Sequence, residues 1–328
     1  APAQEVTVAI SSTFATLDPA LISTTHMAHV YGNMGSNFYR TDANGVLQYD
    51  LGESMEKSED GLTYTFTIKE GLKWSDGESL TAEHFVYGIK RAIGYGPDNA
   101  YTKKNLVNFI AGAEEAANAV MDVADMTNVG VVALDDTFQV TLSPPCPYFE
   151  RIFSSNVTSP MRPDCALEHD SSWSVNGTYP SSGPMVLESI SPEEEAVLVK
   201  NENYWDAENV TLEKATFVVM TDSTAQVNAF RTGDIDIAMS VPSEVATNAE
   251  YESNIVMPEK YVSNYFVLIN SGSKAQVEAL KDENVRKALA LAIDKDTMLN
   301  ILGSKANVRL EVINTLLDPL FIYGFGMG

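Results

Sequence analysis

A strand–helix–strand pattern in the second half of the chain most strongly limits how this sequence can fold. Ala215–Met220 is an apolar run of strand length, and Asp234–Ala238 is a second, shorter strand pattern. Between them, Ser223 and Gln226 have the spacing of a capping box, and Gly233 is placed to end the helix. Strands connected through one helix are normally parallel with a right-handed crossover, so we expect a parallel α/β unit here.

The first half of the chain has hairpin patterns instead. Glu5–Ile10 alternates apolar and polar residues, and Thr63–Ile68 is the clearest such alternation, so both are predicted strands. Two further strands are predicted near 129–134 and 138–142, joined by a turn. Thr81 is the predicted N-cap of a helix. The apolar stripe of that helix consists of Phe85, Ile89, Ala92 and Ile93.

The remaining segments complete the expected element order. Ala113–Met121 is a predicted helix, and Ser159–Pro184 is rich in proline and serine, which favours a boundary or a long surface connection. Tyr261–Asn270 is a predicted long strand, and Asp282 is expected to cap a following helix. The apolar face of this last helix consists of Val285, Leu289, Ala292 and Ile293.

Composition excludes several classes of protein. The 328 residues include 21 basic and 45 acidic side chains, which gives a net charge of −24. A nucleic-acid binder or a protein docked on anionic lipid needs the opposite balance, so we expect neither. No apolar run reaches the roughly 18 residues of a membrane span. With 45% hydrophobic and 20% charged residues, the composition is that of a globular protein.

The sequence has no recognisable catalytic or metal-binding signature. His26 and His29 are three residues apart, but no further ligand stands nearby with the spacing of a zinc site. Cys146 lies between prolines without a basic neighbour, which argues against a reactive thiol. A disulfide between Cys146 and Cys165 and two idle thiols are both open. We therefore expect no enzyme activity, no metal and no cofactor.

Five segments, in order, resemble one protein family. The segment Asp60–Tyr87, with the sequence DGLTYTFTIKEGLKWSDGESLTAEHFVY, is similar to the signature of the solute-binding proteins of oligopeptide and dipeptide ABC importers, bacterial extracellular solute-binding protein family 5. The other four segments are Leu17–Ala20 (LDPA), Asn201–Asp206 (NENYWD), Phe230–Asp236 (FRTGDID) and Val285–Asp294 (VRKALALAID). Each match alone is weak, but together they are specific.

This resemblance implies an α/β, periplasmic-binding-protein-like fold (type II, Venus-flytrap), in which a lobe carries an inserted α+β subdomain. Lobe one is expected over 1–40 and 160–264, and the inserted subdomain of hairpins and helices over 41–159. Lobe two is expected to start over 265–309. The tail 310–328 is either a strand that returns to lobe one or a divergent end. Because the family is considerably longer, we expect most of the second lobe to be absent.

The resemblance also implies a function and a site. Family members bind peptides without catalysis, by pairing the peptide main chain with protein edges between two hinged lobes. The corresponding edge here is Ser23, Thr24 and Thr25, for which an ordinary polar loop is the competing interpretation. Tyr101 is the nearest match to a tyrosine that faces the cleft. No position matches the carboxylate that binds the peptide amino group in many relatives. With most of the second lobe absent, we expect the chain to bind peptide weakly or not at all.

The expected partners follow from this function. They are a peptide ligand and an ABC permease, with the protein itself a monomer. The location implied is outside the cytoplasm, either periplasmic or tethered to the cell surface as a lipoprotein. Two different functions stay open at this point: a peptide-sensing or protein-docking module without a transport role, and a binder of nickel, haem or sugar on the same fold.

Overall fold

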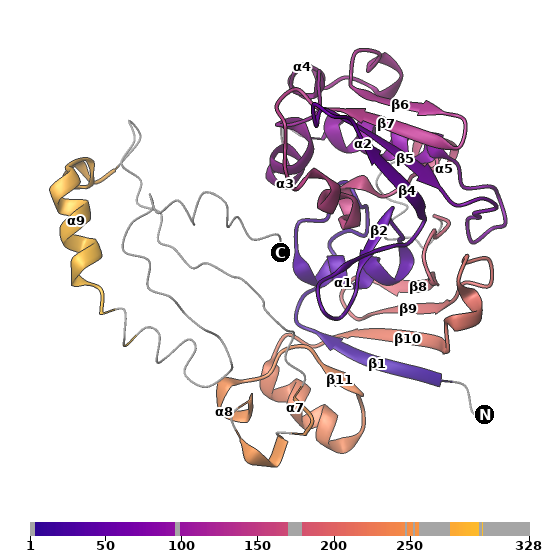
Figure 1. The fold of residues 1–328 in the computed structure, drawn as a ribbon. Coiled ribbons are helices and arrows are strands. Elements are labelled where there is room, and N and C mark those ends of the chain that lie inside the picture. Colours follow the sequence, from indigo (N-terminus) through magenta and orange to yellow (C-terminus); the bar gives the residue numbers. More distant parts are fainter. Residues whose placement is uncertain are drawn as a thin grey trace. The chain divides into compact units, whose positions relative to one another are not determined.

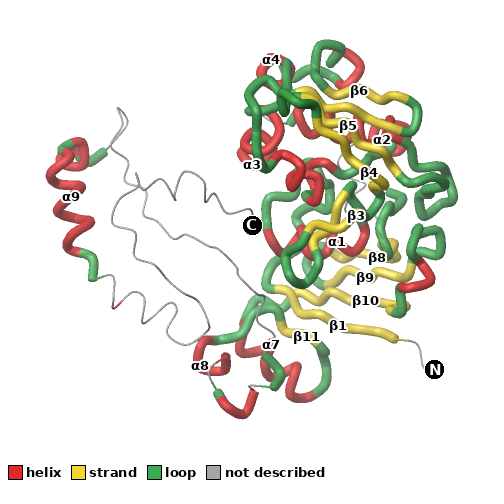
Figure 2. The backbone as a smooth tube through the Cα atoms, in the orientation of Figure 1, coloured by secondary structure: helices red, strands yellow, loops and turns green. Residues whose placement is uncertain are grey.

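The computed structural model describes residues 4–95, 99–169, 179–246, 248–251, 253–255, 276–294 and 297 (Figure 1). The chain forms two compact units, Ala1–Val241 and Pro242–Gly328. The first unit contains two main sheets, and the second contains short helices (Figure 2).

The first sheet has five strands in the order β11-β1-β10-β9-β8. Its strands are β1 (Gln4–Ile10), β8 (Met185–Ser191), β9 (Glu195–Lys200), β10 (Leu212–Val219) and β11 (Ile237–Ala238). The predicted parallel unit is confirmed in part, because β10 and β11 are both parallel to β1. They are not neighbours, however, since β1 lies between them.

Helix α7 (Ser223–Thr232) connects β10 to β11, and its first turn differs from the prediction. Asp222, not Ser223, is the N-cap, because its carboxylate accepts the N–H of Ala225 at 2.7 Å. A carboxylate also complements the positive end of the helix. Gln226 is buried, and its side chain bonds the backbone at Met220 and Ser240 rather than the helix cap. The capping box was therefore wrong, whereas Gly233 ends the helix in the left-handed region as predicted, with φ 80°.

Helices cover both faces of this sheet. Helix α1 (Thr25–Met34) packs Met27 and Val30 on the face that contains Ile10 and Phe217. Helix α7 packs on the opposite face, where Ala229 meets Ala9. Neighbouring residues of a strand point to opposite faces, so β1 is covered on one face at Ile10 and on the other at Ala9.

The second sheet is antiparallel, in the order β4-β5-β7-β6. Its strands are β4 (Gly52–Lys57), β5 (Thr63–Ile68), β6 (Val131–Leu134) and β7 (Thr137–Thr141). The alternation predicted for β5 is confirmed: Tyr64, Phe66 and Ile68 are buried and the threonines between them are half-buried. The two strands predicted near 129–142 are confirmed as β6 and β7.

Helix α2 (Ala82–Gly94) packs against this sheet. All four residues of its predicted stripe are buried: Phe85, Ile89, Ala92 and Ile93. Thr81 is the N-cap as predicted. The imidazole Nδ1 of His84 accepts the N–H of Thr81 at 3.0 Å, so histidine closes the capping box.

Short elements complete the first unit. They are β2 (Tyr39–Thr41), β3 (Leu47–Tyr49), α3 (Ala100–Thr102), α4 (Ala113–Asn118) and α5 (Pro163–His169), with a π-helix at Lys103–Val107 and 3-10 turns at Val123–Asp125, Phe149–Ser154, Asn156–Thr158 and Ala207–Asn209. The helix predicted over Ala113–Met121 is thus confirmed but shorter. Part of the predicted connection Ser159–Pro184 lies outside the described residues.

The segment Asn201–Asp206 connects to the chain near β4. The hydroxyl of Tyr204 and the indole N–H of Trp205 both donate to Oδ1 of Asp50, each at 2.9 Å. The ammonium of Lys69 lies 4.4 Å from the centre of the Trp205 ring. This segment, one of the five that resemble the family, therefore has a structural role: it binds the chain at Asp50 and Lys69 within the first unit.

The second unit is described at α8 (Ser243–Ala246), at α9 (Glu283–Ala292) and at 3-10 turns over Ala249–Tyr251 and Glu278–Lys281. Asp282 caps α9 as predicted, accepting the N–H of Asn284 at 2.8 Å. No residue of α9 is buried among the described residues. The predicted strand Tyr261–Asn270 lies outside the described residues.

The predicted domain boundaries stay predictions, and the tail 310–328 lies outside the described residues. Among the described helices, none combines the length and apolarity needed to cross a bilayer.

Candidate functional site

The predicted binding edge lies where a turn leads into helix α1. Ser23, Thr24 and Thr25 are all exposed. Thr24 is the N-cap of α1, and its hydroxyl accepts the N–H of Met27 at 3.4 Å. The three residues belong to no described strand, so the edge is the extended start of a helix rather than a sheet edge.

Part of the backbone at this edge is unpaired among the described residues, although the Thr24 carbonyl accepts the N–H of Ala28 at 3.1 Å. Within the part of the chain that the structure describes, the N–H groups of Ser23, Thr24 and Thr25 and the carbonyl of Ser23 have no hydrogen-bond partner. Exposed backbone groups of this kind can pair with the main chain of an extended ligand.

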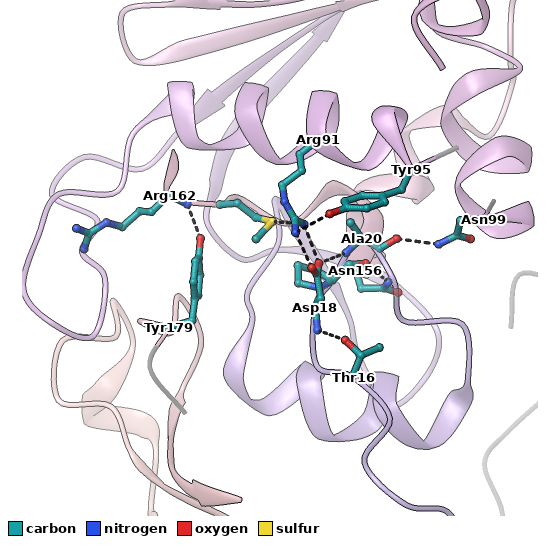
Figure 3. Close-up of polar contacts among 11 residues, drawn as sticks. Thr16, Asp18, Ala20, Arg91, Tyr95, Asn99, Asn156, Arg162 and Tyr179 are labelled. Atoms are coloured by element: carbon teal, nitrogen blue, oxygen red, sulfur yellow. Dashed lines mark hydrogen bonds and ion pairs between the residues drawn. The ribbon is translucent and has the colours of Figure 1, made fainter. Parts of the chain in front are cut away.

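The turn before this edge is held from one side by two asparagines (Figure 3). The amide of Asn156 donates to the carbonyl of Pro19 at 2.6 Å and to that of Ile22 at 3.5 Å. The amide of Asn99 donates to the carbonyl of Ala20 at 2.7 Å. Three carbonyls of the turn, those of Pro19, Ala20 and Ile22, thereby have partners inside the protein.

A buried ion pair lies beneath the turn. The guanidinium of Arg91 makes two hydrogen bonds to the carboxylate of Asp18, at 2.8 and 2.6 Å. The Asp18 side chain has no exposed surface and that of Arg91 is 9% exposed. Burial opposes the charge on Arg91, but the hydrogen bonds and charge of Asp18 outweigh it and raise the Arg91 pKa.

Tyr101 lies beside the same turn. It belongs to α3, two residues after Asn99, and its hydroxyl is 3.1 Å from the hydroxyl of Ser155. Ser155 directly precedes Asn156, which holds Ile22. A short series of contacts therefore connects Tyr101 with the backbone that leads to Ser23.

The sequence prediction missed the residues that hold this turn: Asp18, Arg91, Asn99 and Asn156. One signal was present, because Arg91 lies between the apolar positions Ile89 and Ala92 of the helical stripe. An arginine there is buried only with a partner, which implies a buried carboxylate elsewhere.

The other candidates are not brought together. Cys146 is buried and Cys165 is half-buried, and both are free thiols in the structure. Burial raises the pKa of each thiol. His26 and His29 share helix α1, where Nε2 of His26 lies 3.3 Å from the Ser11 hydroxyl. The described residues contain no group of three or more side chains suited to hold a metal ion.

Comparison with known proteins agrees with the resemblance. The family model for bacterial extracellular solute-binding proteins, family 5 Middle, matches residues 46–316. The periplasmic oligopeptide-binding protein OppA of Escherichia coli K12 is 28% identical over 296 residues, which cover 89% of this chain and 53% of that protein. A probable deoxycholate-binding periplasmic protein of the same strain, YgiS, is 28% identical over 315 residues, covering 94% of this chain and 56% of that protein.

The solved structures confirm the fold. The Escherichia coli murein tripeptide binding protein MppA has a TM-score of 0.79 and 25% identity, with coverage of 92% of this chain and 58% of that one. This likeness confirms the predicted periplasmic-binding-protein-like α/β fold. The chain spans about half the length of the curated relatives it matches. On the match over residues 46–316, the chain belongs to the bacterial extracellular solute-binding proteins of family 5.

Proposed function

We propose that this chain is a non-catalytic substrate-binding component of an ABC importer, and that it captures peptides by main-chain pairing at Ser23, Thr24 and Thr25. One observation supports this most directly. Ser23 is an exposed residue whose backbone N–H and carbonyl are unpaired among the described residues, while the preceding turn is anchored by Asn99 and Asn156. Tyr101 would contact the ligand beside that edge.

Main-chain pairing explains how one site would accept many peptides. Every peptide offers the same N–H and carbonyl groups, so affinity from backbone pairing is largely independent of side chains. Closure of two hinged lobes would add contacts from a second wall. The partner would be a membrane permease, and the protein would act as an exported monomer, periplasmic or tethered to the cell surface as a lipoprotein.

An NMR titration tests the proposal on the chain as it stands. The ¹⁵N-labelled 328-residue protein would be titrated with alanine peptides of two to five residues. We expect saturable shifts of the amide signals of Ser23, Thr24, Thr25 and Tyr101, even at millimolar affinity. A folded protein whose amide signals do not move with any of the peptides would refute peptide capture by this chain.

A second ligand class belongs in the same experiment. The relative named as a probable deoxycholate-binding protein is as similar to this chain as OppA is. Deoxycholate has no peptide groups and cannot pair with a protein edge along its length. Shifts at Ser23–Thr25 with deoxycholate but not with peptides would favour an amphipathic, non-peptide ligand and contradict our proposal.

Proteins with the two remaining functions would behave differently in these assays. A binder of nickel, haem or sugar would respond to that ligand and not to alanine peptides. A peptide-sensing or protein-docking module without a transport role would bind peptide but fail to stimulate a reconstituted permease. Transport assays with and without this chain separate that module from an importer subunit.

A further inference from the structure

A buried carboxylate organises the turn that leads into the proposed binding edge (Figure 3). Besides its two bonds with Arg91, the Asp18 side chain accepts the N–H of Ala20 at 2.9 Å. The Asp18 carbonyl accepts the N–H groups of Leu21 at 2.9 Å and Ile22 at 3.0 Å. Three successive N–H groups of the turn are thus bonded to one residue.

The partner of this carboxylate is fixed by its own surroundings. Arg91 lies on α2, one turn after Gly88 and between buried residues of the apolar stripe. Its guanidinium also contacts the Tyr95 hydroxyl and the Met161 sulfur, each at 3.5 Å. A bidentate arginine held in this way defines both the place and the direction of the carboxylate that it binds.

The bonds made by Asp18 and those made by the two asparagines end at one point along the chain, which separates paired from unpaired backbone. From Asp18 to Ile22, every backbone N–H of the turn that is able to donate has a partner, and Asn99 and Asn156 bind carbonyls on the other side. Among the described residues, the first unpaired N–H and carbonyl groups after the turn are those of Ser23. The fixed turn therefore ends where the proposed binding edge begins.

We infer that Asp18 and Arg91 are positioning residues for ligand capture: their buried ion pair holds the turn so that the unpaired N–H groups of Ser23, Thr24 and Thr25 and the carbonyl of Ser23 are preset for pairing with a peptide. The inference rests on the proposed function. Without the ion pair, the edge would sample other conformations, and the apparent affinity would fall in proportion to the population that remains competent.

The first test needs no ligand. In Asp18→Asn, one carboxylate oxygen becomes an NH₂ group that cannot accept from Arg91. We expect hydrogen exchange of the Leu21 and Ile22 amides to become about tenfold faster or more, as local opening becomes easier. The matched control is Asp50→Asn, which alters another buried carboxylate with two donors, the side chains of Tyr204 and Trp205. In that control, exchange at Leu21 and Ile22 should not change.

The second test measures affinity for tetra-alanine by NMR titration. A turn that is competent for one tenth of the time would bind about tenfold more weakly, which we expect for Asp18→Asn. Arg91→Lys keeps the charge but cannot make the two parallel hydrogen bonds of the guanidinium. Its affinity for tetra-alanine should therefore lie between those of Asp18→Asn and the wild type. Asp50→Asn should bind as the wild type does. If Asp18→Asn does not fold, Arg91→Lys provides the same comparison.

The outcomes separate the inference from the proposed function. If the wild type binds and the Asp18 and Arg91 variants bind equally well, the positioning role is wrong and peptide capture stands. If Asp50→Asn weakens binding as much as Asp18→Asn does, the ion pair contributes only general stability and the inference is also wrong. If the wild type binds no peptide, the proposed function fails, whatever the exchange data show.

Discussion

The contact between α2 and the backbone at Ser159 gives a sharp stability prediction. A Cβ atom added at Gly88 would lie 2.1 Å from the Ser159 carbonyl oxygen and 3.3 Å from the Met161 nitrogen. This segment is also bonded to the helix, because the N–H of Met161 donates to the His84 carbonyl at 2.9 Å. The helix and the segment approach so closely because residue 88 has no side chain.

The cost of Gly88→Ala follows from this geometry. The oxygen must move roughly 1 Å or more to reach an ordinary contact distance, and overpacking of this kind costs about 1–3 kcal/mol. Weakening of the hydrogen bond from the Met161 N–H to the His84 carbonyl contributes a further cost of at most about 1 kcal/mol. The higher helix propensity of alanine returns about 1 kcal/mol. We expect a net loss of about 2 kcal/mol.

A second helical glycine provides the control. Gly32 lies inside α1, and nothing stands within 4 Å of the position that a Cβ would occupy. Gly32→Ala should therefore gain about 0.5–1 kcal/mol from helix propensity alone. Urea unfolding followed by tryptophan fluorescence measures both changes in the first unit, because all three tryptophans lie in Ala1–Val241. Equal effects of the two substitutions would refute the close contact at Gly88.

Three further variants test other parts of the fold. Tyr204→Phe removes one of two side-chain donors to buried Asp50 and should lower the free energy of unfolding by about 1 kcal/mol in the same urea assay. An unchanged free energy of unfolding would contradict a structural role for the Tyr204–Asp50 bond. Burial and then the charge of Arg162 lower the pKa of His84 from its ordinary 6.5, so the unfolded chain takes up the proton first as the pH falls. The urea midpoint should therefore drop as the pH decreases below about 6.5, and His84→Asn should reduce that dependence; an unchanged slope would exclude His84 as the cause. Gly233→Ala places a side chain at φ 80° and should lower the melting temperature, at a cost of about 1 kcal/mol; an unchanged melting temperature would contradict this cap geometry.

Patterns along the sequence were most informative where a single face decides the structure. The alternation in Thr63–Ile68 predicted β5 because its apolar side chains meet one core. The stripe that follows Thr81 predicted α2 for the same reason. The choice between neighbouring cap residues was harder to predict, because Asp222 and Ser223 are both suitable N-caps. The buried amide of Gln226 bonds the backbone at Met220 and Ser240 and so does not take part in a capping box.

Contacts between distant parts of the chain could not be predicted from local patterns. Strand β1 pairs with residues 212–219, so its place between β10 and β11 depends on partners some two hundred residues away. Asp18 and Arg91 are 73 residues apart. The site prediction therefore named the exposed edge through its resemblance to a family, while the ion pair beneath it required three-dimensional contacts.

Main-chain pairing at Ser23–Thr25 is the central claim, and replacing a peptide bond tests it directly. Tetra-alanine would be compared with analogues in which one amide becomes an ester, which removes one N–H donor and leaves the side chains unchanged. We expect one analogue to bind about fivefold more weakly, since one hydrogen bond contributes about 1 kcal/mol, while exchange of an alanine for leucine or serine changes little. Equal binding of every ester analogue, with strong dependence on side chains, would contradict the account.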